Sequence, residues 1–276
     1  MNMFSRLALL LFVAMMGTVC HGETPEDSIF VEKLLASGHQ ETLWYARQYM
    51  GRPYVAHTLE VNDTEQLVVN TREVDCTTYV ENVLALTLCA RRGQAHYADF
   101  KRMLSFLRYR NGVMDAYPSR LHYFTDWIND NVKKGTVENI VMSEMPFSAI
   151  QTVKVGYMSA HPEAYRALRE HPEFLAPIKE AEQRLTGGKY PYIPIAKIDN
   201  SKELRSVIHD GDVVAITTTK EGLDISHLGF AVWKKDGLHL LNASSIYKRV
   251  VLEPLVMRKY LAQRKTNTGI RLIRLR

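Results

Sequence analysis

Apolar residues recur with two different periods along the chain, and the change of period divides it into two halves. Over the first half they recur every three to four positions, which predicts helices around residues 27–50, 76–92, 100–107 and 123–128. From Gly211 onward they alternate or form β-branched runs, which predicts antiparallel strands at 212–218, 226–233, 238–243, 249–252 and 269–273. Helices followed by such a sheet predict an α+β fold.

Shorter segments add detail to this outline. Residues 57–71 alternate around an Asn-Asp pair, which predicts a hairpin, and residues 190–194 predict an extended linker. Pro162 and Pro172 each stand where the first residue of a helix is expected. Near the C-terminus, basic residues alternate with apolar ones, as on the solvent face of a helix and an edge strand. With a net charge of only +5, this pattern gives no reason to expect a nucleic-acid partner.

The N-terminus has the pattern of an export signal. Arg6 precedes an apolar run over residues 7–16, and small residues follow up to Gly22. The run is too short for a stable membrane anchor, and Val19 fits poorly before a lipid-modified Cys20. We therefore expect a signal peptide at 1–22 and one exported, periplasmic domain at 23–276, with a lipoprotein as the less favoured alternative.

Export leaves Cys76 and Cys89 in the mature chain. Both fall on one predicted helix, about 20 Å apart, so they cannot form a disulfide with each other. Cys76 stands in the first turn, where Asp75 or Thr77 can cap the helix and the helix dipole favours a thiolate. Cys89 has no such setting, and we expect it in the core, as for most lone cysteines.

A histidine and an asparagine on neighbouring predicted strands are the partners that Cys76 needs. His227 and Asn242 stand five residues before Val232 and five after Gly237, so a hairpin would bring them face to face. Cysteine at a helix start, histidine and an orienting asparagine form the arrangement of papain-like catalysis. The chain has no nucleophile-elbow, phosphate-loop or zinc-binding motif, so we expect no metal and no cofactor.

These residues carry a family resemblance. The chain resembles the NlpC-type papain-like cell-wall cysteine hydrolases and, more closely, their N-acetylmuramoyl-L-alanine amidase-like branch, through motifs at 52–54, 74–81, 122–127, 193–194, 211–213, 222–230 and 242–243. The resemblance spans residues 30–275. It implies a papain-like fold with a helical insertion at 94–206, between Cys76 and His227. It also implies hydrolysis of the amide between (1,6-anhydro-)N-acetylmuramic acid and L-alanine.

The same resemblance implies roles for single residues. Cys76 attacks, His227 acts as general base and acid, Asn242 orients His227 in place of the family's commoner histidine, and Tyr54 lies by the oxyanion. Candidate substrate-binding residues are Asp75, Thr77, Tyr123 and Trp127.

Alternatives remain for several of these assignments. Asp75 serves equally well as a helix cap. His122, Tyr123 and Trp127 of the insertion are candidates to line a sugar pocket, but an aromatic helix face is more often core. We expect a monomer acting on soluble muropeptides. The competing functions are a γ-D-glutamyl–diamino-acid endopeptidase on the same scaffold and a non-catalytic wall-binding protein.

Overall fold

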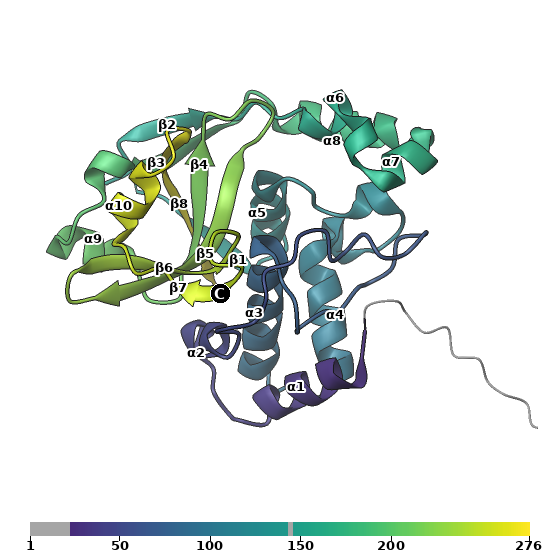
Figure 1. The fold of residues 1–276 in the computed structure, drawn as a ribbon, viewed down its shortest axis with the longest axis horizontal. Helices are drawn as coiled ribbons and strands as arrows, with labels where there is room; N and C mark the ends of the chain where they lie inside the picture. The colour runs from purple at the N-terminus through teal and green to yellow at the C-terminus, as the bar shows by residue number, and fades with distance from the viewer. Residues whose placement is uncertain (1–22, 143–145) are drawn as a thin grey trace, which may run out of the picture.

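A computed structural model describes residues 23–142 and 146–276; the expected signal peptide lies outside them. The protein is a mixed α/β structure in which helices pack against an antiparallel sheet (Figure 1). The helices are α1 (Pro25–Leu35), α2 (Thr42–Arg47), α3 (Cys76–Arg91), α4 (Tyr97–Arg108), α5 (Phe124–Lys133), α6 (Tyr157–Ala160), α7 (Arg166–Glu170), α8 (Leu175–Leu185), α9 (Lys202–Val207) and α10 (Met257–Ala262). The strands are β1 (Val137–Ile140), β2 (Ala149–Thr152), β3 (Lys189–Pro194), β4 (Val213–Thr218), β5 (Ile225–Lys234), β6 (Gly237–Ser244), β7 (Arg249–Leu252) and β8 (Asn267–Leu275).

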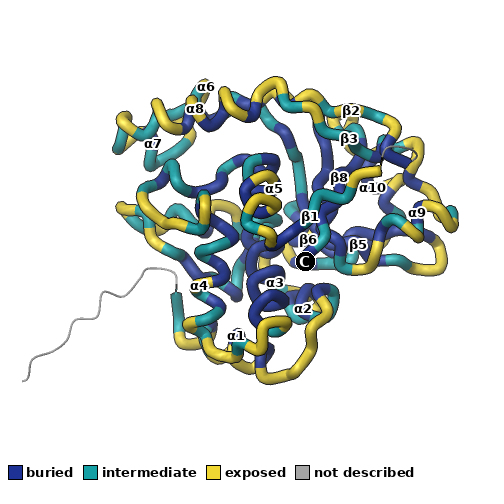
Figure 2. Tube along the Cα trace, turned by 180° about the vertical axis from the view of Figure 1, so that it is seen from behind, coloured by how far each residue is buried: buried dark blue, intermediate teal, exposed yellow. Residues whose placement is uncertain are grey.

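Helix α3 is the centre of the main core. Asp75 caps it, since its Oδ1 accepts a 2.8 Å hydrogen bond from the backbone N–H of Thr78. Residues 78–89 of the helix are all buried, and they pack between the sheet and helices α1, α2 and α4 (Figures 1 and 2). A helix that is apolar on nearly every face needs this enclosure. Cys89 is fully buried in it, as predicted.

The sheet runs in the order β2-β3-β8-β4-β5-β6-β7, with β1 also paired to β8 and every pair antiparallel. All five predicted strands are present. However, β8 is not the predicted edge strand, because β4 pairs with one side of it and β1 and β3 with the other. This covering buries Arg271, whose Nη1 donates a 2.8 Å hydrogen bond to Thr125 Oγ1.

The insertion at 94–206 is not purely helical. It contributes α4 to α9 and also strands β1, β2 and β3, so residues 190–194 belong to a sheet strand and not to a linker. Pro162 and Pro172 do begin short helical turns, as expected. Helices α6 to α8 have a small core of their own, separate from the main one (Figure 1). Two distant segments thus complete one sheet, a non-local pairing that short patterns do not reveal.

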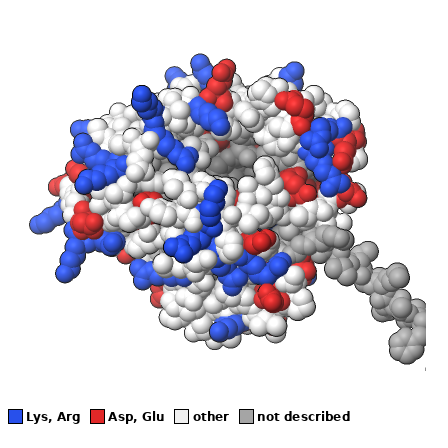
Figure 3. Space-filling model, viewed as in Figure 1, with Lys and Arg blue, Asp and Glu red and all other residues white. Residues whose placement is uncertain are grey.

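The predicted hairpin at 57–71 is absent. Its polar groups bond to the insertion instead: Arg120 pairs with Glu60 at 2.6 Å, and Arg108 donates a 2.7 Å bond to the carbonyl oxygen of Val68. Basic and acidic side chains are interspersed on the face shown in Figure 3. Within residues 23–142 and 146–276, no helix is long and apolar enough to cross a membrane.

Candidate active site

Cys76 is the first residue of α3, and it lines a cavity of about 180 Å³ together with His227. The backbone of Leu228, which follows His227 on β5, lies within hydrogen-bonding reach of the cysteine sulfur. The free backbone amides of a first helical turn point out of the helix end, so the sulfur lies beside unsatisfied N–H donors. The predicted thiol and imidazole therefore open into the same space.

His227 is hydrogen-bonded to Asn242, as the sequence predicts. The distance from His227 Nε2 to Asn242 Oδ1 is 2.9 Å, and Asn242 Nδ2 donates to the carbonyl oxygen of Leu240 at 3.4 Å. That second bond orients the amide, so Oδ1 must accept from Nε2–H. Nδ1 of His227 is then the basic nitrogen, the one that can take a proton from a thiol.

The strand register differs from the expected one by two residues. Phe230 pairs with Leu241 and Lys234 with Gly237, so the turn holds only two residues. A shift of two keeps both side chains on the same face, because side chains alternate along a strand. Gly229 separates them: a Cβ there would lie 2.9 Å from the Cβ of Asn242. His227 reaches Asn242 diagonally across this gap.

Both reacting groups are neutral in the resting site. Burial, with the carboxylate of Asp75, raises the pKa of the Cys76 thiol to about 12. Burial lowers the pKa of His227; Asn242 opposes this effect and the charge of Arg264 adds to it. The prediction that the helix dipole favours a thiolate is therefore wrong for the free protein, because desolvation and a neighbouring carboxylate outweigh it. The site holds a thiol and a neutral imidazole.

Tyr54 lies close to Cys76 but is not among the residues that line the cavity. A bridge joins Tyr54 to Val74, and the backbone N–H of Tyr54 donates to Lys248 at 2.9 Å. Burial and the neighbouring Cys76 raise the pKa of Tyr54 to about 12, so the phenol keeps its proton. No described residue hydrogen-bonds to its hydroxyl, which leaves Tyr54 able to donate to a substrate oxygen.

The four predicted substrate-binding residues have different surroundings. Thr77 and Tyr123 line the cavity, where the Tyr123 hydroxyl donates to Glu182 at 2.6 Å. Asp75 is not among the lining residues, and it caps α3. Trp127 is fully buried and stacks on Phe124 at 4.9 Å in the main core, so it does not reach the cavity. The core alternative is correct for this tryptophan.

Sequence reasoning missed part of the cavity wall. Met158, Tyr165 and Asp224 line it. His122 lines it too, as one of the insertion residues that the sequence offers for a sugar pocket. Asp224 is buried and its Oδ2 accepts a 2.6 Å bond from the backbone N–H of Thr125, which fixes the start of α5 against β5. An aspartate two residues after the single turn glycine Gly222 is a weak signal, and only the fold brings these segments together.

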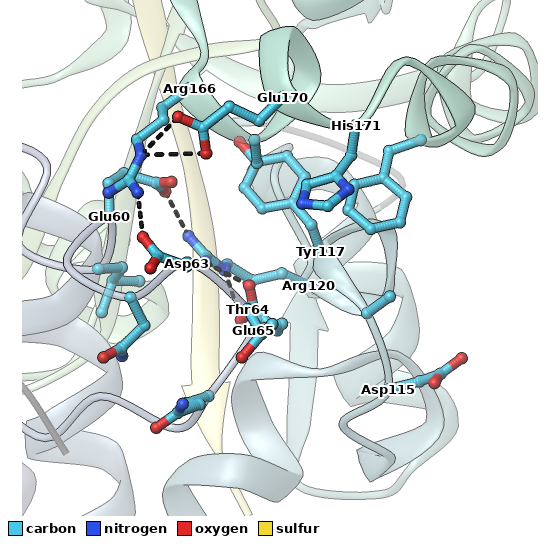
Figure 4. A pocket seen from close by; sticks show the side chains of 16 residues that line it. Glu60, Asp63, Thr64, Glu65, Asp115, Tyr117, Arg120, Arg166, Glu170 and His171 are labelled. Atoms are coloured by element: carbon cyan, nitrogen blue, oxygen red, sulfur yellow. Dashed lines mark hydrogen bonds and ion pairs between the residues drawn. The ribbon is translucent and has the colours of Figure 1, made fainter. Parts of the chain in front are cut away.

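A second cavity lies on the other side of Tyr117. Acidic and basic side chains face each other in it, with Arg120 bonded to Glu60 and Glu65 and Arg166 paired with Asp63 and Glu170 (Figure 4). Tyr117 lines this second cavity, and its ring lies 4.4 Å from that of His122 in the first. Among the described residues, no three potential metal ligands lie together in either place.

Comparison with known proteins adds independent information. A family model described as N-acetylmuramoyl-L-alanine amidase-like matches residues 45–270. The crystal structure of an N-acetylmuramoyl-L-alanine amidase from Bacteroides uniformis is 40% identical over 87% of this chain and 99% of that one, with a TM-score of 0.80.

Two further solved structures are similar. A putative xylanase from Bacteroides fragilis is 41% identical over 84% of this chain and 100% of that one, with a TM-score of 0.78. A protein from Legionella pneumophila is 25% identical over 91% and 94%, with a TM-score of 0.70. No curated protein matches the chain.

Proposed function

The chain belongs to the N-acetylmuramoyl-L-alanine amidase-like family, and on that premise we propose that it hydrolyses the amide between the lactyl group of N-acetylmuramic acid and L-alanine. The observation that carries this proposal is the shared cavity of Cys76 and His227, with His227 bonded to Asn242. This constellation supports a cysteine hydrolase of the papain-like, NlpC type.

In the proposed reaction His227 Nδ1 accepts the proton of the Cys76 thiol as the sulfur attacks the lactyl carbonyl carbon. The C–N bond breaks, His227 returns the proton to the leaving amine of L-alanine, and a thioester remains on Cys76. Water, deprotonated by His227, then hydrolyses the thioester and regenerates the thiol. Asn242 holds the imidazole in the tautomer that this sequence requires, because its Oδ1 accepts from Nε2–H.

Two donors are available for the negative charge that develops on the carbonyl oxygen. The backbone N–H of Cys76 lies in the first turn of α3, where amides have no helical acceptor. The Tyr54 hydroxyl is protonated and without a described partner. Donors that are already in place when charge develops stabilise the transition state without reorganisation, so this pair supports acyl transfer.

We further propose that the natural substrates are soluble muropeptides with a 1,6-anhydro terminus, and that the enzyme acts as a monomer after export. The insertion at 94–206 supplies Leu121, His122, Tyr123, Phe124, Met158 and Tyr165 to the cavity wall. A wall of this kind on one side of the cysteine suits a small fragment better than a continuous polymer strand.

Incubation with an anhydro-disaccharide-tetrapeptide and mass analysis of the products tests the proposal, with the Cys76→Ala protein as the matched control. We expect free disaccharide and a tetrapeptide that begins with L-alanine, and no products from the control. A sugar fragment that still carries L-alanine and D-glutamate would identify the endopeptidase instead. No cleavage by the wild-type protein would reject hydrolysis and favour a wall-binding role.

A further inference from the structure

His122 lines the Cys76–His227 cavity, yet the proposed chemistry does not use it. Its Nε2 lies 2.9 Å from the carbonyl oxygen of Tyr117. A carbonyl oxygen can only accept, so Nε2 carries the proton and Nδ1 of the neutral ring has a lone pair. No described residue donates a hydrogen bond to that Nδ1. The cavity therefore contains a fixed acceptor that has no protein partner.

The ring is held rigidly from the side of the second cavity. The Tyr117 ring lies tilted against it at 4.4 Å, and the Arg120 guanidinium lies 5.0 Å from the centre of the Tyr117 ring. Glu60 and Glu65 fix Arg120 in turn, at 2.6 and 2.5 Å (Figure 4). Burial and the charge of Arg120 lower the pKa of His122 to about 3, so the ring is neutral near neutral pH.

The charges around the site indicate which half of the substrate enters the cavity. No lysine or arginine lines it, and Asp224 is its one carboxylate among the described residues. A stem peptide carries carboxylates, which such a space disfavours. Arg264 lies elsewhere: it is exposed, forms no ion pair with the described residues, and its charge acts on His227 and Tyr54. Its loop is tied to β5 by a bond from Ser226 Oγ to Asn267 Oδ1, at 3.1 Å.

We propose that the cavity holds the muramyl sugar and that His122 selects it, by accepting a hydrogen bond at Nδ1 from an N–H or O–H group of the sugar. The inference rests on the proposed amidase function and names the residue that recognises the neutral half of its substrate. The peptide half then leaves the cysteine on the side of Tyr54 and Arg264.

Two substitutions separate this role from a structural one. The amide of His122→Asn can present an acceptor near the position of Nδ1 but loses the bond to Tyr117. His122→Gln reproduces the Nε2 donor to Tyr117 and has no acceptor near Nδ1. His122→Phe removes both. The matched control is His161→Asn, because His161 is an exposed histidine outside this cavity.

The test compares N-acetylmuramoyl-L-alanyl-D-glutamate with the same compound in which a methyl group replaces the sugar. For the sugar substrate, we expect kcat/KM to fall about ten- to hundred-fold in the Phe and Gln variants, mainly through KM, and less in the Asn variant. For the sugar-free substrate and for His161→Asn we expect values near wild type. The inference would be overturned if kcat/KM fell equally for both substrates. It would also be overturned if His122→Gln kept full activity on the sugar substrate while His122→Asn lost it.

Alkylation of Cys76 gives a second measurement that does not depend on turnover. Free N-acetylmuramic acid should slow the reaction of iodoacetamide with Cys76 in the wild-type protein and in His122→Asn, and should fail to do so in His122→Phe. The dipeptide L-alanyl-D-glutamate should give no protection that depends on His122. Equal protection by the sugar in every variant would reject the role of His122. Amidase activity without this dependence rejects the inference alone, whereas absent activity rejects the proposed function.

Discussion

The two walls of the cavity have different origins. One wall comes from the start of α3 and the start of β5, which supply Cys76, Thr77 and residues 226–228. The other comes largely from the insertion, which supplies residues 121–124, Met158 and Tyr165. The first wall carries the groups proposed to react, and the second carries groups that can only bind. The comparison suggests that reaction and recognition depend on separate parts of one chain and can be altered separately.

The two histidines show this difference most directly. Each donates Nε2–H to an oxygen at 2.9 Å and keeps Nδ1 as an acceptor. His227 directly precedes Leu228, whose backbone lies within hydrogen-bonding reach of the Cys76 sulfur. Burial lowers the pKa of His227 below its usual value, and the proposed reaction uses its imidazole to take and return a proton. His122 is half-buried near Arg120, and its pKa of about 3 prevents it from acting as a base near neutral pH. The same side chain thus serves two purposes in two environments.

Removal of the nucleophile should have the largest effect. Cys76→Ala should lower kcat by roughly a thousandfold or more, since the other groups cannot replace the attacking atom. Cys89→Ala is the control, because Cys89 is fully buried in the main core and away from the cavity. Activity is measured by release of L-alanyl peptide, and folding by circular dichroism. A Cys76→Ala protein as active as wild type would end the cysteine mechanism.

The wall formed by the starts of α3 and β5 is also the part of the cavity that the sequence predicts well. The helix start at Cys76 follows from a local cap by Asp75, and β5 and β6 follow from alternation within ten residues. Even the error in register, two residues, leaves His227 and Asn242 on one face, because the side-chain period of a strand is two. Local signals were enough here.

The wall supplied by the insertion depends on contacts between residues far apart in the sequence, which local patterns do not reveal. Tyr123 bonds to Glu182, 59 residues away, and β1 pairs with β8 across more than a hundred residues. The strands β1 and β2 have only four residues each, too few for a clear alternation. Whether Trp127 faces the cavity or the core depends on where the sheet lies relative to α5, which the helix pattern alone does not tell. Of the two aromatic residues that the sequence assigned to the cavity, Tyr123 lines it and Trp127 belongs to the core.

Changes to the orienting residue should have an intermediate effect. Asn242→Ala removes the acceptor of His227 Nε2–H, so the ring can adopt the other tautomer or turn away from the sulfur. We expect kcat/KM to fall roughly ten- to hundred-fold, less than the near-complete loss in His227→Ala. Asn242→His should recover much of the activity, because an imidazole nitrogen can also accept that bond. An Asn242→Ala enzyme with the kcat/KM of wild type would show that the third member lies elsewhere.

The smallest expected effect is a shift in the pH dependence, and it separates the two histidines. Only neutral His227 can accept the thiol proton, so kcat/KM should fall as the pH drops through the lowered pKa of His227, below its usual value of about 6.5. The positive charge of Arg264 contributes to that lowering. Arg264→Gln should therefore raise the pKa of His227 and move the acid limb to higher pH, by a small amount because Arg264 is exposed to solvent. His122→Asn should reduce kcat/KM without moving the limb, since His122 is already neutral throughout this range. If the acid limb of the kcat/KM profile moved in His122→Asn and not in Arg264→Gln, His122 and not His227 would be the base.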